Sequence, residues 1–227
     1  MTTREFAARF LPPTMARYTR VPWLVITRTL DLVVTGFTAI FQIVMILTQS
    51  LQPGYNPLRD TISSMVWSPF GWLQTVNFYV CGFLLIILVR RLRVCMTHDF
   101  VAKAASMLLF LIGVGFIILA ICPTQSPGSV KTIQAIIHGI SVYFITISFP
   151  TSCFLVASSL HKNHRNILIY LYTIVTGCIG LVLIVVGVYL NIVGAHWFGL
   201  LERVLLLNGF IWLEIMYILR GVYTLKS

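Results

Sequence analysis

Long runs of apolar residues dominate the chain, and short polar stretches separate them. Six of these runs reach about 20 residues, the length that a helix needs to cross the hydrocarbon core of a bilayer. They cover residues 29–50, 70–89, 102–122, 132–158, 167–190 and 198–219. Because a bilayer offers the backbone no hydrogen-bonding partners, we expect each run to be an α-helix. The pattern predicts an all-α, polytopic membrane protein built as a bundle of six transmembrane helices.

The remaining polar stretches predict no separate soluble domain. We expect an N-terminal cytoplasmic or interfacial segment over residues 1–28, a transmembrane domain over 29–220 and a short cytoplasmic tail over 221–227. The first of these lacks the continuous apolar core of a signal peptide. Its phenylalanines lie among arginines, which is typical of a segment that lies on a membrane surface.

Composition and charge support this assignment and add an orientation. Only 10% of the residues are charged, against about 25% in an ordinary soluble domain. Of the 16 Lys and Arg residues, all but Arg59, Lys131 and Arg203 lie on the side of the two termini. Since cytoplasmic loops hold the excess of Lys and Arg, we expect both termini in the cytoplasm. The basic residues behind the net charge of +10 then set the orientation in the membrane and contact anionic lipid headgroups. We expect no nucleic-acid partner.

The stretch YNPLRDTISSMVWSP combines polar residues with apolar ones beside the second run. Asp60, Ser63 and Ser64 follow a spacing that places them on one face of an α-helix, and prolines bracket the segment. The spacing predicts a short amphipathic helix over residues 58–67 at the outer interface. Asp60 either caps this helix or pairs with Arg59, and the alternative is a role in a functional site with Ser64.

Three further polar residues fall near the same outer side. His138 is about 10 Å below the surface at 1.5 Å per residue, and it is either a hydrogen-bonded packing residue or a ligand. Glu202 is expected in the first turn of the last run, where its negative charge would interact favourably with the helix dipole. Arg203 could bind a lipid phosphate through its planar guanidinium, as could Arg59 and Lys131.

Other polar positions predict packing between helices. Gln74, Asn77 and Asn208 would supply hydrogen bonds between helices, and Gly139 would permit close helix approach. On the inner side, Asp31 is expected to pair with Arg28. Glu214 needs a partner, for which Arg28 is a further candidate. The five cysteines are odd in number and form no CxxC motif, so we expect no disulfide framework.

Several motifs resemble an uncharacterised prokaryotic family of six-span proteins, domain of unknown function 998. They are DTISSM followed by W and P, NF-x-x-CG, GVGFIILAICPT, the histidine at 138 and GLLER. The resemblance implies a prokaryotic inner-membrane location. Where the family often has an aspartate after the proline that closes the third run, this chain has Thr124 and Gln125. This departure weakens any chemistry that needs a carboxylate there.

A more distant likeness to Frag1/DRAM-type proteins would imply a role in lipid handling. The order of Ser, Asp and membrane His is also similar to intramembrane metal-dependent hydrolases such as alkaline ceramidases. Those enzymes have seven spans and an HxxxH helix, whereas this chain has six predicted spans and no such pair.

Three functions stay open. The favoured one is a non-catalytic membrane protein, a lipid-binding or scaffold subunit of a membrane complex. The second is a metal- or His-dependent hydrolase that acts on a lipid headgroup. Its candidate catalytic residues are Asp60, Ser64, His138 and Glu202, and His138 would be the general base or the metal ligand. The third is a small transporter. We expect bound phospholipid and no other cofactor, and as partners membrane lipids and other membrane subunits.

Overall fold

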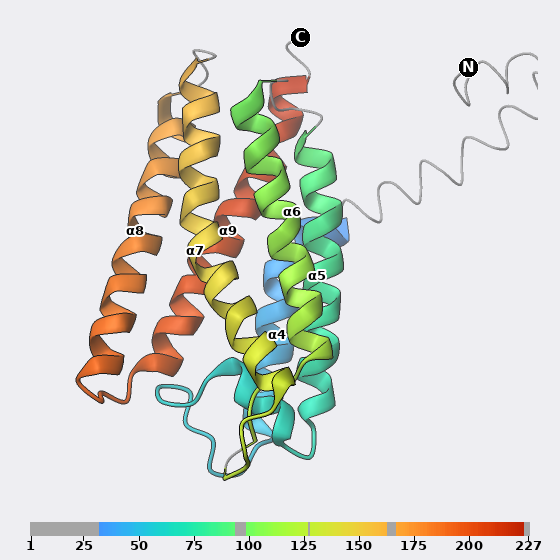
Figure 1. The fold of residues 1–227 in the computed structure, drawn as a ribbon. Helices are drawn as coiled ribbons and strands as arrows, with labels where there is room; N and C mark the ends of the chain where they lie inside the picture. The colour runs from blue at the N-terminus through green and yellow to red at the C-terminus, as the bar shows by residue number, and fades with distance from the viewer. Residues whose placement is uncertain (1–31, 94–98, 127, 163–166, 225–227) are drawn as a thin grey trace, which may run out of the picture.

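The computed structural model describes residues 32–93, 99–126, 128–162 and 167–224. These residues form helices and connecting loops, with no strand among them (Figure 1). The elements are α4 (Phe37–Ser50), the 3-10 helix η1 (Ile62–Trp67), α5 (Gly71–Arg93), α6 (Phe100–Ile121), α7 (Ile133–Lys162), α8 (Ile167–Ile192) and α9 (Phe198–Thr224). The all-helical prediction is therefore confirmed, and each of the six apolar runs overlaps one α-helix.

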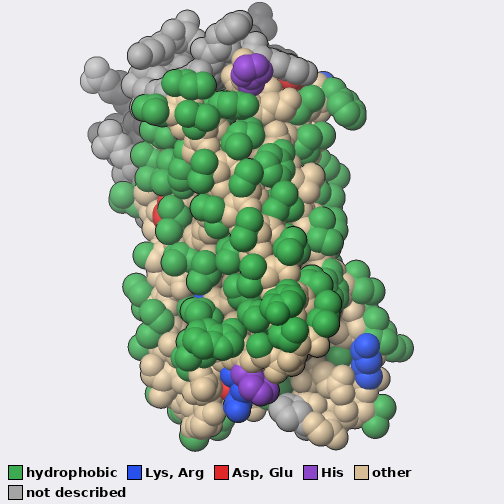
Figure 2. Space-filling model, turned by 90° about the vertical axis from the view of Figure 1, so that its left-hand side faces the viewer, with side chains coloured by type: hydrophobic (Ala, Val, Ile, Leu, Met, Phe, Trp, Pro, Cys, Tyr) green, Lys and Arg blue, Asp and Glu red, His purple; other side chains and the backbone are tan. Residues whose placement is uncertain are grey.

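Four of these helices, α5 to α8, are long and apolar enough to cross a membrane. The described part of α4 is shorter than a span, and α9 carries Glu202, Arg203 and Glu214. Figure 2 shows an apolar surface between the two ends of the molecule. Such a surface would be unfavourable in water and suits the hydrocarbon of a bilayer. The protein is an integral membrane protein that crosses the bilayer several times.

Helices that follow one another in the chain pack side by side, and α9 returns to contact α4 and α5. The return closes the bundle (Figure 1). We call the end with the loops at 51–61, 123–132 and 193–197 the Arg203 end. The opposite end, where α5 ends and α6 begins, is the Arg90 end.

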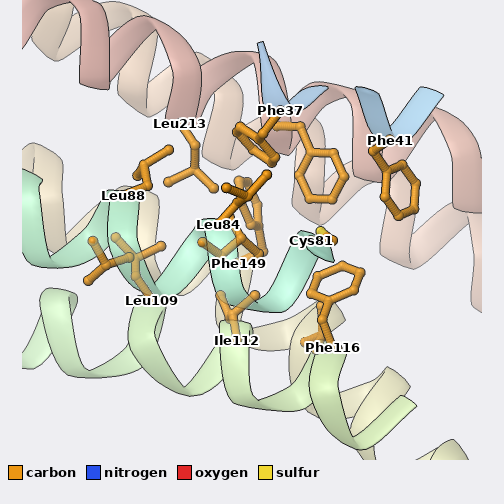
Figure 3. Close-up of a cluster of buried hydrophobic side chains, with 14 of the residues drawn as sticks. Phe37, Phe41, Cys81, Leu84, Leu88, Leu109, Ile112, Phe116, Phe149 and Leu213 are labelled. Carbon is orange, nitrogen blue, oxygen red and sulfur yellow. The ribbon is translucent and has the colours of Figure 1, made fainter. Parts of the chain in front are cut away.

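A cluster of phenylalanines joins four helices in the core. Phe210 of α9 lies 5.0 Å from Phe37 and 5.1 Å from Phe41 of α4, and 5.8 Å from Phe116 of α6, measured between ring centroids. Phe78 of α5 lies 6.3 Å from the rings of Phe41 and Phe116. Figure 3 shows Phe37, Phe41 and Phe116 reaching into this cluster. Such ring pairs contribute about 0.5–1.5 kcal/mol each beyond the area that they bury.

Glycines allow α5 and α6 to touch through their backbones. A Cβ atom on Gly82 would lie 2.7 Å from the carbonyl oxygen of Gly113 and 2.7 Å from Cγ1 of Ile117. The close approach predicted at Gly139 is wrong, because a Cβ atom there would meet nothing within 4 Å. Gly139 thus faces open space, which the sequence around it does not reveal.

Two of the three predicted amide side chains bond between helices, whereas Gln74 accepts a hydrogen bond of 3.4 Å from Asn77 of its own helix. Asn77 of α5 donates to the carbonyl of Phe41 in α4 at 3.1 Å, and Asn208 of α9 donates to the carbonyl of Thr176 in α8 at 3.1 Å. The indole N–H of Trp212 adds a bond to Thr173 of α8 at 3.2 Å, which was not predicted. The bonds of Asn208 and Trp212 fix the rotation of α9 against α8, and the bond of Asn77 does the same for α5 against α4, because each has one geometry that satisfies it.

The predictions for the inner polar residues are only partly testable. Arg28, Asp31, the N-terminal segment 1–28 and the last three residues of the tail lie outside the described residues. Glu214, for which Arg28 was a candidate partner, lies beside Thr38 of α4.

Replacing Gly82 with alanine should separate α5 from α6. The added methyl group has to displace the backbone of Gly113, and overpacking of this kind costs about 1–3 kcal/mol. We expect a lower free energy of unfolding and a lower melting temperature in detergent. Gly139→Ala is the matched control, because it adds the same methyl group in open space and should be neutral or slightly stabilising. Equal melting temperatures for the two variants would contradict the close contact.

Candidate functional site

The loop before η1 folds back on itself at the Arg203 end. Gly54 allows the turn with a positive φ of 73°. The half-buried Tyr55 then points its hydroxyl at two backbone carbonyls, those of Asp60 at 3.0 Å and Thr61 at 2.9 Å. Burial raises the pKa of Tyr55 to about 12, so the phenol stays protonated at physiological pH and donates to these carbonyls.

Arg203 of α9 reaches across to this loop. Its Nη1 donates to the carbonyl of Asp60 at 3.0 Å and to the carbonyl of Gly199 at 2.7 Å. Its Nη2 donates to the hydroxyl of Tyr55, and the guanidinium carbon lies 5.5 Å from the centroid of the tyrosine ring. The planar group therefore joins α9 to the loop through several contacts at once, which a lysine could not reproduce.

Glu202, the neighbour of Arg203, makes the second connection. Its Oε2 accepts a hydrogen bond of 2.7 Å from the backbone N–H of Ile62, the first residue of η1. The expectation that Glu202 serves the dipole of its own helix is wrong, because it lies beyond the first turn of α9. A carboxylate at the start of η1 satisfies an N–H group that the helix leaves without an internal partner.

The backbones of the two segments also meet directly. The N–H of Leu200 donates to the carbonyl of Leu58 at 3.0 Å. A Cβ atom on Gly199 would lie 2.4 Å from the carbonyl oxygen of Asp60, so only glycine fits there. We call the contacts of Tyr55, Gly199, Glu202 and Arg203 with the 57–62 backbone the polar lock.

The backbone carbonyl of Asp60 belongs to the lock, whereas its carboxylate pairs with Arg59. Nε of Arg59 donates to Oδ1 of Asp60 at 2.7 Å, and the N–H of Asn56 donates to Oδ2 at 2.8 Å. The Arg59 hydrogen bond holds the pKa of Asp60 below its ordinary value of 3.8. A lowered pKa stabilises the fold above pH 3.8, and this contribution is lost as the pH falls further. Of the two structural alternatives for Asp60, pairing with Arg59 is confirmed.

The capping alternative is wrong, and so are the predicted helix bounds of 58–67. The helix begins at Ile62 as a 3-10 helix, and the side chain of Thr61 caps it by accepting from the N–H of Ser64. The residues before it form a turn in which the N–H of Asp60 donates to the carbonyl of Asn56 at 2.7 Å. The α-helical spacing used for the prediction therefore does not apply to Asp60.

His138 lies in a different contact at the same end. It is 3% exposed, and its Nδ1 is 2.7 Å from the carbonyl oxygen of Cys122 at the end of α6. Because a carbonyl only accepts, Nδ1 carries the proton and Nε2 presents a lone pair. Nε2 is buried and has no hydrogen-bond partner in the described part of the chain. The structure gives His138 no hydrogen bond to Asp60, Ser64 or Glu202.

The other candidates are placed as follows. Ser64 donates its hydroxyl to the carbonyl of Thr61 at 2.7 Å. Arg59 and Lys131 are exposed at the Arg203 end, whereas Arg203 already has backbone partners. Among the described residues, no three His, Cys, Asp or Glu side chains gather closely enough to hold a metal ion.

Sequence reasoning missed Tyr55 and Gly199. Tyr55 and Arg203 are 148 positions apart, and the only signal that relates them is that both fall on the predicted outer side. Gly199 opens GLLER, but nothing in that motif indicates that its neighbour is the backbone of a loop.

A family model described as "Protein of unknown function (DUF998)" matches residues 36–218 of the chain. The match begins just before α4 and extends through most of α9, so it includes every residue of the polar lock. No curated protein and no solved structure matches the chain.

Replacing Arg203 with lysine should open the polar lock. The variant keeps the charge but loses the fork that binds two carbonyls and a hydroxyl, so the loop at 52–62 should exchange its amide hydrogens faster. Hydrogen exchange followed by mass spectrometry measures this change. Arg59→Gln is the control, because it removes a cation from an exposed pair of the same loop and should change exchange little. Equal protection of the loop in wild type and Arg203→Lys would contradict the lock.

Proposed function

The chain belongs to the DUF998 family, and we propose that it is a non-catalytic membrane protein that binds lipid and serves as a scaffold or auxiliary subunit of a membrane complex. Nothing in this proposal requires a reaction at the Arg203 end. In this proposal, the residues of the polar lock have a structural role.

The observation that carries the proposal is that Arg203 and Glu202 are hydrogen-bonded to other groups of the protein itself. Arg203 donates to the carbonyls of Asp60 and Gly199 and to Tyr55, and Glu202 accepts from the N–H of Ile62. A catalytic acid, base or phosphate-binding group has to exchange its partners with substrate during a reaction. Releasing these two side chains would instead leave backbone groups unpaired and detach α9 from the loop.

The least covered helix, α8, supports a role in assembly. Only 28% of its most apolar window is buried, against 44–50% in α5, α6 and α7, and its main packing partners are α7 and α9. Large side chains such as Val182, Val185 and Tyr189 are each at least 61% exposed. We assign this face to lipid or to a neighbouring subunit in the plane of the membrane.

The proposed topology has six spans with both termini in the cytoplasm of a prokaryotic cell. The excess of Lys and Arg on the side of the termini supports this orientation, and helical residues 32–35 before Gly36 extend α4 toward a full span. The Arg203 end then faces outward. The exposed Arg59 and Lys131 would contact lipid phosphates there, while Arg203 serves the fold.

One observation favours a hydrolase as the second candidate. Nε2 of His138 is a buried lone pair without a partner among the described residues, and such a group could act as a general base or bind a metal ion. The apolar phenylalanine cluster in the core gives no such support to the transporter alternative.

Native mass spectrometry of the protein extracted gently from its own membrane tests the proposal. We expect phospholipid and a second membrane subunit in fixed stoichiometry, both retained in His138→Ala. Val185→Trp on the exposed face of α8 should release the subunit. Ile147→Trp on α7, where the side chain is 59% exposed, is the matched control and should retain it. A stoichiometric metal ion that is lost in His138→Ala would contradict the proposal and favour the hydrolase.

A further inference from the structure

A cavity of about 510 Å³ opens between α5 and α6 at the Arg90 end. Cations line one part of it, namely Arg90 and Arg93 of α5 and Lys103 of α6. Apolar side chains, among them Ile86, Met107 and Phe110, line the other part. The cavity therefore has a charged end and an apolar wall that runs along the two helices. Ligand pockets commonly measure about 300–1,000 Å³, so its size suits a bound molecule.

The glycine contact explains why the cavity lies where it does. Gly82 and Gly113 bring the two backbones together, and the cavity begins one helical turn beyond them, at Ile86 and Phe110. From that contact the helices splay apart toward the Arg90 end (Figure 1). The space between them is therefore a consequence of the crossing geometry, and it widens toward the predicted lipid headgroups.

The three cations of the cavity have no counter-charge in the described part of the chain. Arg90, Arg93 and Lys103 are exposed, and the structure gives none of them an ion pair. Asp99 is the acidic residue closest in sequence, and its carboxylate accepts from the N–H of Ala102 as the cap of α6. No acidic side chain lines the cavity. Three cations that share one cavity without a counter-ion attract an anion strongly.

We propose that this cavity binds one anionic phospholipid. Its phosphate would lie among Arg90, Arg93 and Lys103, and an acyl chain would lie along Ile86, Met107 and Phe110. Basic pockets between transmembrane helices bind anionic headgroups in this way, and the guanidinium fork matches the geometry of a phosphate. The inference rests on the proposed lipid-binding role and names its ligand class, but it requires neither a partner subunit nor the exposed Arg59 and Lys131.

The test measures lipid binding to the full chain in detergent by native mass spectrometry. Phosphatidylglycerol is the anionic probe, and phosphatidylcholine is the zwitterionic one. We expect one phosphatidylglycerol to bind more tightly than phosphatidylcholine, with no displacement by inorganic phosphate. Each cation near a headgroup changes the affinity about fivefold, so Arg90→Gln with Lys103→Gln should weaken this first binding event about 25-fold. Arg90→Lys with Arg93→Lys keeps the charge but loses the guanidinium forks, so it should weaken binding less than the double glutamine variant does.

The matched control removes the same residue types from the other end. Arg59→Gln with Lys131→Gln should leave the first phosphatidylglycerol in place, and the melting temperature of each variant shows that it is folded. Equal weakening by the two double variants, or equal affinity for the two lipids, would overturn the cavity as the site. Displacement by inorganic phosphate would assign the site to a free anion instead. None of these results bears on whether a partner subunit co-purifies, so the two proposals can fail separately.

Discussion

The fold depends on how α9 is held against the rest of the bundle at the Arg203 end. Inside a bilayer, lipid tails are as apolar as the helices, so burial alone does not determine where the last helix docks. The polar lock supplies this information, because Arg203 and Glu202 each satisfy backbone groups of the loop before η1. With its beginning fixed, α9 can place Phe210 and Trp212 in the core, where they meet α4, α7 and α8.

The charged side chains at the two ends of the molecule have different surroundings. At the Arg203 end, Glu202 and Arg203 of α9 are hydrogen-bonded to carbonyls, a hydroxyl and an N–H group of the protein itself. At the Arg90 end, Arg90, Arg93 and Lys103 line an open cavity whose lining includes no acidic side chain. Glu202 and Arg203 of α9 thus serve the fold, whereas Arg90, Arg93 and Lys103 are exposed. His138 stands apart from both arrangements, with one ring nitrogen bonded and the other buried without a partner.

The sequence predicts the helices well, because a run of about 20 apolar residues has few other stable states in a bilayer. It also predicts Asn77 and Asn208 as contacts between helices, but it is wrong for Gln74, whose buried Nε2 has no hydrogen-bond partner in the described part of the chain. The prediction from sequence fails where the backbone departs from the α-helical repeat. The segment around Asp60 was interpreted as an α-helix, but the turn at 56–60 and the cap at Thr61 shift the helix to Ile62. It also cannot relate Tyr55 to Arg203, because the partners of Arg203 are mostly backbone carbonyls, which carry no residue-specific signal.

The measurement that tests the account most directly is a double-mutant cycle between Arg203→Lys and Tyr55→Phe. Reversible unfolding in detergent gives the free energy of unfolding for both single variants and for the double variant. If the polar lock holds α9 in place, the two substitutions are coupled by about 0.5–3 kcal/mol, as for residues of one hydrogen-bond network. Effects that add to within about 0.5 kcal/mol, as for independent sites, would show that Tyr55 and Arg203 act separately and would contradict the lock.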